Sequence, residues 1–156
     1  MENLIWATLL WLLVFILIPF DRIKTIWPAA VISMVLGFLL NYAFIQWGYW
    51  EFTRYLVLIA GVPPFHVLGI GAGGILFVNW IKRDFVNKVI VVVFWSVLLT
   101  LAEFIMIYVD AYQFLKGFNY TLAFIRNVAG LSFSVWLSIM LLGEEKVYGG
   151  KKTRFS

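Results

Sequence analysis

The sequence has no cysteine, only one histidine and few charged residues. Of its 156 residues 13% are charged, whereas an ordinary globular domain has about 25%. The absence of cysteine excludes disulfide bonds, thiolate metal sites and cysteine nucleophiles. Because the chain is also 63% hydrophobic, with a mean hydropathy of +0.96, a soluble globular domain and a disordered chain are both excluded.

Long apolar runs take the place of the missing charges. A helix needs about 20 apolar residues to cross the hydrocarbon core of a bilayer, and five runs meet this length. They predict an all-α membrane protein with five transmembrane helices in a single domain, residues 1–142, followed by a short basic tail, residues 143–156. The predicted spans are Leu4–Phe20, Ile26–Trp47, Tyr55–Trp80, Val89–Val109 and Tyr120–Leu142.

Lysine and arginine are unevenly divided between the two sets of loops that alternate across the membrane. The set that includes the C-terminal tail carries nine cations, and the other set carries three. The positive-inside rule therefore predicts an N-terminus outside the cell and a cytoplasmic C-terminus. Because it lies in loops and the tail, the net charge of +4 indicates topology, not a nucleic-acid partner. The nine cations are Arg22, Lys24, Lys82, Arg83, Lys88, Lys146, Lys151, Lys152 and Arg154.

Two prolines interrupt the third predicted span. Pro63 and Pro64 remove backbone donors and disfavour a straight helix, so we expect the third helix to be kinked or broken at Pro63-Pro64. The following glycine-rich segment, Gly69–Gly74, formally matches the dinucleotide-binding pattern G-x-G-x-x-G. It lacks the preceding strand and the βαβ context of that motif, and it is more typical of close helix packing in a membrane.

Ionisable residues within the spans are the strongest candidates for a functional site, because a charge at a helix centre costs about 2.5–3.5 kcal/mol on insertion scales. Glu103, Arg126 and Asn41 each lie about six residues, or about 9 Å, from the same predicted outer boundary. We predict that Glu103 and Arg126 form an ion pair, with Asn41 and Asn127 bonding the remaining groups. In the alternative, Arg126 extends to the headgroups, and Glu103 is protonated or bonds a backbone carbonyl.

The only histidine, His66, is predicted near the middle of the membrane, beyond the two prolines. It could relay protons with Glu103, or it could simply bond a carbonyl freed by the helix break. A lone histidine lacks the ligand spacing of zinc motifs, so no metal site is expected. No cofactor motif and no set of catalytic residues is recognisable.

Several segments resemble a family of small uncharacterised multi-pass membrane proteins of Firmicutes, which includes proteins of spore-formers. The resemblance covers roughly residues 20–142 and is absent from the Pro-Pro and glycine-rich part of the third span. It implies a multi-pass protein of a bacterial plasma membrane, draws attention to Glu103 and to Trp50-Glu51, and implies no reaction. The segments are Arg22–Lys24, Trp47–Phe52, Phe85–Lys88, Trp95, Glu103 and Lys116–Asn119.

Three classes of function remain open. The first is a structural or accessory membrane protein that contacts the bilayer and packs with its own copies or with a partner membrane protein. The second is a small transporter or proton-coupled carrier centred on Glu103 and Arg126, and the third is a lipid-acting membrane enzyme. An accessory protein predicts mutually satisfied polar groups, a carrier predicts a water-filled cavity that reaches Glu103, and an enzyme predicts a groove open to lipid.

Overall fold

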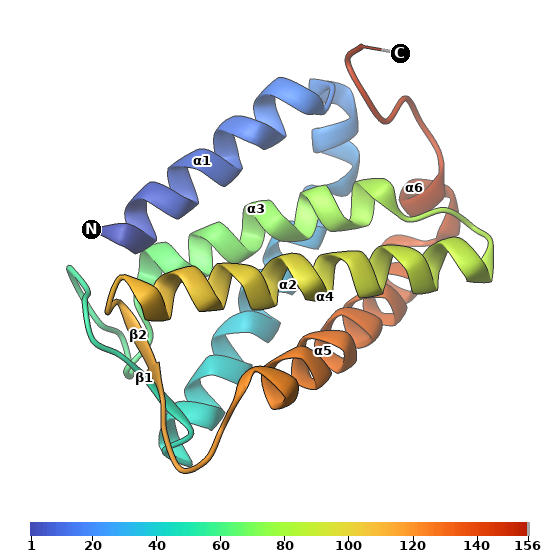
Figure 1. Cartoon of the computed structure of the whole chain (residues 1–156). Coiled ribbons are helices and arrows are strands. Elements are labelled where there is room, and N and C mark those ends of the chain that lie inside the picture. Colours follow the sequence, from blue (N-terminus) through green and yellow to red (C-terminus); the bar gives the residue numbers. More distant parts are fainter. Residues whose placement is uncertain (156) are drawn as a thin grey trace.

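The computed structural model describes residues 1–155, and the chain is 72% helical. In that part of the chain, long helices run back and forth between two ends of a bundle (Figure 1). The helices α2 (Phe20–Gln46), α4 (Phe85–Tyr108) and α5 (Tyr120–Leu142) are long and apolar enough to cross a membrane. The apolar helices α1 (Glu2–Leu17) and α3 (Pro64–Trp80) are shorter, at 16 and 17 residues. A mostly helical fold with membrane-length apolar helices is therefore confirmed.

The two ends of the bundle are built differently. One end, here called the sheet end, carries the short strands β1 (Trp50–Phe52) and β2 (Tyr112–Phe114). The other, here called the tail end, carries α6 (Glu144–Tyr148) and the extended segment that follows it. The N-terminus lies at the sheet end and the C-terminus at the tail end (Figure 1).

The strands join the connection before α3 to the connection before α5. They pair antiparallel, with Trp50 opposite Phe114 and Phe52 opposite Tyr112. Successive strand residues face opposite sides, so Trp50 and Phe52 are buried while Glu51 is exposed. Both segments are loops in the sequence-based prediction, which therefore missed the sheet.

Two predicted boundaries were wrong. Residues 55–63 are not helical, because α3 begins at Pro64 and Pro63 lies before it in an extended conformation. A proline in the first turn lacks only a donor that would have no partner in the helix, so the two prolines start α3 instead of kinking it. The predicted loop Asp21–Thr25 is also helical, since α2 begins at Phe20 and only Ile18 and Pro19 separate it from α1.

Glycines allow the first three helices to pack closely, as expected for small-residue stripes in membrane helices. A Cβ atom at Gly71 would lie 2.9 Å from Met34 Cγ, and one at Gly37 would lie 2.6 Å from Ile70 Cδ1. Either substitution would force the side chain of Met34 or Ile70 to move. The contacts are Gly37 with Ile70, Gly71 with Met34, Gly74 with Ser33 and Gly69 with Ala7.

Candidate functional site

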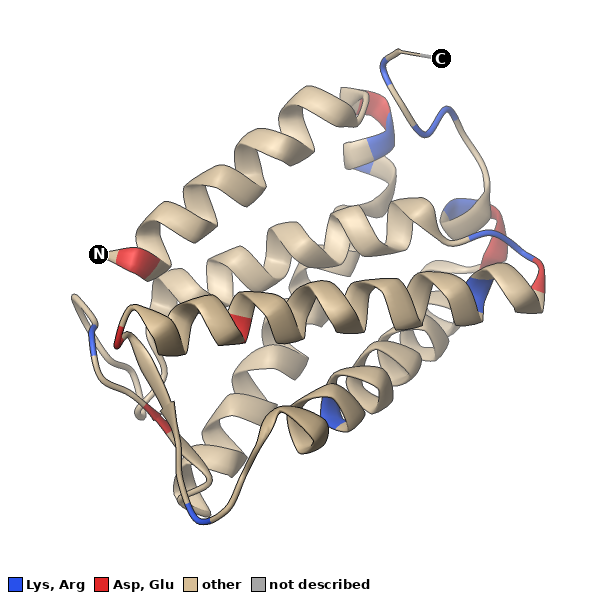
Figure 2. Cartoon of the chain, viewed as in Figure 1, with Lys and Arg blue, Asp and Glu red and all other residues tan. Residues whose placement is uncertain are grey.

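Polar side chains form one buried group near each end of the bundle. Most charged residues lie at the two ends (Figure 2), whereas Glu103 on α4 and Arg126 on α5 lie within the helices. The sheet-end cluster consists of Thr100, Glu103, Arg126 and Asn127. The tail-end cluster consists of Arg22, Asn79 and the tail groups that they contact.

In the sheet-end cluster, Arg126 pairs with Glu103 across the α4–α5 contact. Arg126 Nη2 donates a hydrogen bond to Glu103 Oε1 and another, of 2.9 Å, to Asn127 Oδ1. Asn127 Nδ2 in turn donates to Thr100 Oγ1 over 3.3 Å and to Glu103 Oε1 over 3.5 Å. The two charged side chains are only 14% and 19% exposed, so the pair ties two helices together in a mostly dry site.

Aromatic rings cover the guanidinium of Arg126 on the side of the sheet. Its central carbon lies 4.5 Å from the ring centroid of Trp50 and 5.8 Å from that of Phe118. Trp50 is itself buried and stacks on Phe44, with 4.6 Å between centroids. Cation–π attraction strengthens when water is excluded, so β1 contributes directly to the environment of the ion pair. The sequence-based prediction names Trp50 but gives it no role.

One hydrogen-bond acceptor in the sheet-end cluster has no donor. Within the described chain, Glu103 Oε2 and Trp50 Nε1 are buried and have no hydrogen-bond partner. A buried polar atom without a partner is rare and costs roughly 1–3 kcal/mol. The cluster can therefore accept one further hydrogen bond, or a proton, at Glu103.

Asn41 and His66 do not join the contacts of the pair in the predicted way. Asn41 Nδ2 donates to the carbonyl of Gly37 in its own helix, over 2.8 Å. His66 lies in the first turn of α3, at the sheet end, with its ring 5.0 Å from that of Phe52. Its predicted position near mid-membrane was wrong, because the depth was counted from Tyr55 and the helix begins at Pro64. Among residues 1–155, no group of acidic and histidine side chains could hold a metal ion.

The tail-end cluster is organised around Arg22, which is 4% exposed. Its Nη2 donates to the carbonyl of Val147 over 2.7 Å, and Nη1 donates to that of Lys146. Its Nε donates over 3.1 Å to Oδ1 of the fully buried Asn79, whose Nδ2 donates over 2.8 Å to the carbonyl of Lys152. Arg22 is a loop cation in the sequence-based prediction, which missed this cluster.

The tail makes further contacts with the ends of the helices. Lys152 Nζ donates to the carbonyl of Ile81 over 2.6 Å, and Arg154 Nε donates to that of Ile18 over 3.0 Å. Burial, and then the nearby charges of Arg22 and Lys82, lower the pKa of Lys152 to about 8. The predicted short basic tail is thus docked on the bundle over its described residues, and Ser156 lies outside them.

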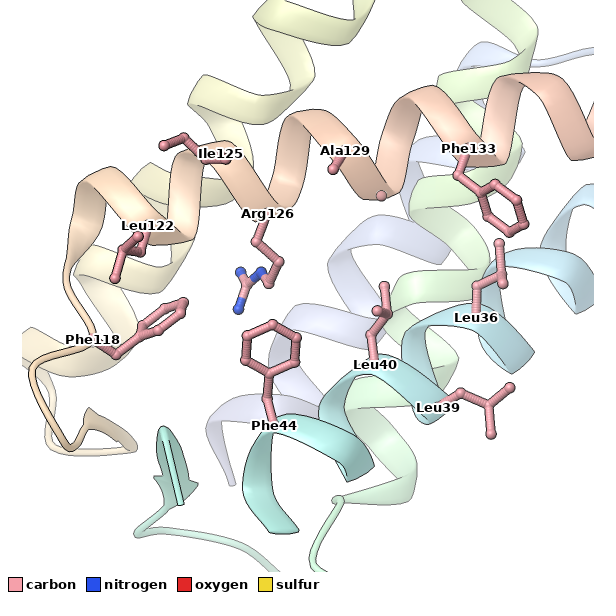
Figure 3. A pocket seen from close by; sticks show the side chains of 11 residues that line it. Leu36, Leu39, Leu40, Phe44, Phe118, Leu122, Ile125, Arg126, Ala129 and Phe133 are labelled. Carbon is pink, nitrogen blue, oxygen red and sulfur yellow. The ribbon is translucent and has the colours of Figure 1, made fainter. Parts of the chain in front are cut away.

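An apolar groove runs between α2 and α5 at the sheet end. It encloses about 600 Å³, and Arg126 is the only charged residue in its wall. Figure 3 shows the guanidinium of Arg126 directed into the space between the rings of Phe44 and Phe118. The other wall residues are Leu36, Leu39, Leu40, Leu122, Ile125, Ala129, Gly130 and Phe133.

The chain matches no protein-family model, no curated protein and no solved structure. The fold and composition define its class: a mostly helical protein with three helices that could cross a membrane. Its apolar helices indicate association with a membrane.

Proposed function

We propose that the protein crosses the plasma membrane of a bacterium five times, with its N-terminus outside and its C-terminal tail in the cytoplasm. The helices α1 and α3 run between the same two ends as the three longer helices (Figure 1), which supports five spans. They are about 24 and 26 Å long at 1.5 Å per residue, so the bilayer thins slightly around them. The concentration of cations at the tail end supports a cytoplasmic tail.

The proposed function is that of a structural or accessory membrane protein. The pairing of Glu103 with Arg126 carries this proposal. The ion pair joins α4 to α5. Because the two charges neutralise each other, they do not form a polar path for a solute. The concave surface beside them is apolar apart from Arg126, so it suits apolar partners in the bilayer more than a water-soluble substrate.

A proton-coupled carrier is the second candidate, and the unpartnered Oε2 atom of Glu103 favours it. The variant Glu103→Gln separates the two functions. For an accessory protein, we expect this variant to lower stability and to weaken copurification with partner membrane proteins. For a carrier, we expect a stable protein that no longer supports proton uptake in reconstituted vesicles.

Single-cysteine labelling tests the proposed threading, because the natural chain has no cysteine and each variant carries one thiol. In intact cells, a membrane-impermeant maleimide should label Asp110→Cys and Tyr55→Cys, both exposed at the sheet end. Lys24→Cys and Lys151→Cys, at the tail end, should react only after permeabilisation. Labelling of all four sites in intact cells would disprove the proposed orientation.

A further inference from the structure

The groove between α2 and α5 has the size of a site for a small ligand. Its volume is about 600 Å³, and ligand sites in proteins usually enclose about 300–1,000 Å³. Apart from Arg126, its wall is apolar. The volume and the apolar wall together favour a thin, flexible apolar chain as the occupant.

The length of the groove matches one leaflet of a bilayer. Along α5 its wall extends from Leu122 to Phe133, a rise of about 16 Å at 1.5 Å per residue. The hydrocarbon core of a membrane is about 30 Å thick, so one leaflet supplies about half of that. The groove starts at the sheet end, where the proposed threading places the outer headgroups, and ends near mid-membrane.

One cation without an acidic partner in the described chain, Lys116, lies near the sheet end of the groove. Arg126 lines the groove, but its charge is paired with Glu103. Lys116 donates from Nζ to the carbonyl of Trp47 over 2.8 Å, and within residues 1–155 it forms no ion pair. The ring of Trp47 lies 5.4 Å from that of Phe44, which lines the groove. The polar end of the groove therefore carries positive charge that Glu103 does not cancel.

We propose that this groove binds one acyl chain of an anionic phospholipid, with the lipid phosphate at Lys116. The apolar wall holds the chain, and Lys116 provides charge complementarity to the phosphate. A neutral lipid or a second copy of the protein would leave the positive end unmatched. This inference rests on the proposed function, because it requires the groove to face the lipid of one leaflet.

Photo-crosslinking with a defined lipid tests the proposal. We would reconstitute the protein in phosphatidylcholine nanodiscs that contain a small fraction of phosphatidylglycerol with a diazirine on one acyl chain. Labelled peptides should come chiefly from residues 36–44 and 118–133. Unlabelled phosphatidylglycerol should compete for this labelling, whereas added phosphatidylcholine or inorganic phosphate should not.

Matched glycine variants show whether the groove itself is the site. A Cβ atom at Gly130 would lie 3.6 Å from Leu40 Cδ1, and one at Gly73, outside the groove, would meet nothing within 4 Å. Gly130→Leu should fill the groove and reduce labelling about fivefold, whereas Gly73→Leu should leave it unchanged. Lys116→Gln should reduce the preference for phosphatidylglycerol over phosphatidylcholine about threefold.

Two results would overturn the proposal. One is labelling spread evenly over all helices without competition, which is the pattern of ordinary surrounding lipid. The other is loss of groove labelling together with cross-linked dimers through α2 and α5, which would make a second copy the occupant. If cysteine labelling supports the threading and either of these results is found, only the proposed lipid site is wrong. If cysteine labelling disproves the threading, the proposed function is wrong as well.

Discussion

The two polar clusters both contain a buried arginine, but the arginines meet different partners. At the sheet end, Arg126 contacts a carboxylate and aromatic rings, so its charge is neutralised within the bundle. At the tail end, Arg22 contacts backbone carbonyls and the amide of Asn79, which satisfy its donors without cancelling its charge. The first arrangement joins two helices, and the second attaches the tail to the bundle while keeping that end basic.

This difference matches the proposed surroundings of each end. A charge within the hydrocarbon region needs an opposite charge, because no water is present to solvate it. A charge near the cytoplasmic surface can stay unneutralised, and carbonyls at the end of α6 are favourable partners for a cation. The predictions below break each cluster in turn.

The largest effect is expected when the ion pair at the sheet end is broken. Arg126→Leu leaves Glu103 buried without its partner, and loss of one member of a buried pair costs about 3–5 kcal/mol. In a double-mutant cycle with Glu103→Gln, the double variant should be less destabilised than the sum of the single variants by about 1–3 kcal/mol. Reversible unfolding in mixed micelles measures all four proteins, and strictly additive effects would show that the two side chains do not interact.

Removal of Arg22 should have the next largest effect, and it should be local. Arg22→Met removes three hydrogen bonds and leaves buried carbonyls without partners, so we expect a loss of about 2 kcal/mol in the docking of the tail. Trypsin should then cut after Lys146 and Lys151 much faster than in the unmodified protein. Arg22→Lys keeps the charge but lacks the planar fork, so its cleavage rate should be intermediate; unchanged cleavage in Arg22→Met would show that the tail is held elsewhere.

The aromatic cover of Arg126 should contribute a smaller amount. Trp50→Phe keeps a ring but weakens the attraction to the guanidinium, which predicts a loss of about 1 kcal/mol in the same unfolding measurement. Trp136→Phe is the matched control, because Trp136 is 55% exposed and should change stability very little. Equal effects of the two variants would mean that Trp50 does not stabilise the cation.

The smallest effect concerns the pH dependence of tail docking. The pKa of Lys152 is lowered to about 8 in the docked tail from its usual value of 10.5, so the undocked tail binds more protons between these values. Below about pH 8 the docked amine is charged, and the full free-energy cost of burying that charge opposes docking. As the pH rises from 8 to 10 the docked amine loses its proton, so docking should strengthen. A nitroxide attached at Lys151→Cys should become less mobile over this range, and Lys152→Met should abolish the change.

The sequence predicts the sheet-end pair but misses the tail-end cluster, for a physical reason. Charges inside apolar runs are rare, so their depths can be compared along the chain, and Glu103 is paired with Arg126 in the structure as this comparison predicts. The partners of Arg22 are mainly carbonyls, which every residue has and which therefore leave no pattern in a sequence.

Two other differences between the sequence-based prediction and the structure come from the direction in which side chains point and from local backbone geometry. Depth along a helix does not define which way a side chain points, which is why Asn41 was assigned to the pair although it bonds its own helix. The short strands were missed because three-residue segments between long apolar helices give too brief an alternation to recognise. The two prolines were recognised as a break, but not as the first turn of α3.

The accessibility of Thr100 to water most directly tests the claim that the Glu103–Arg126 pair is a dry connection between helices. Thr100→Cys places a thiol of similar size beside Asn127, and a small cationic methanethiosulfonate reagent added outside intact cells reports whether water reaches it. We predict that this thiol stays unmodified under conditions in which Asp110→Cys, at the exposed sheet end, reacts completely. Modification of Thr100→Cys at a comparable rate would contradict the account and would favour a water-filled path to Glu103.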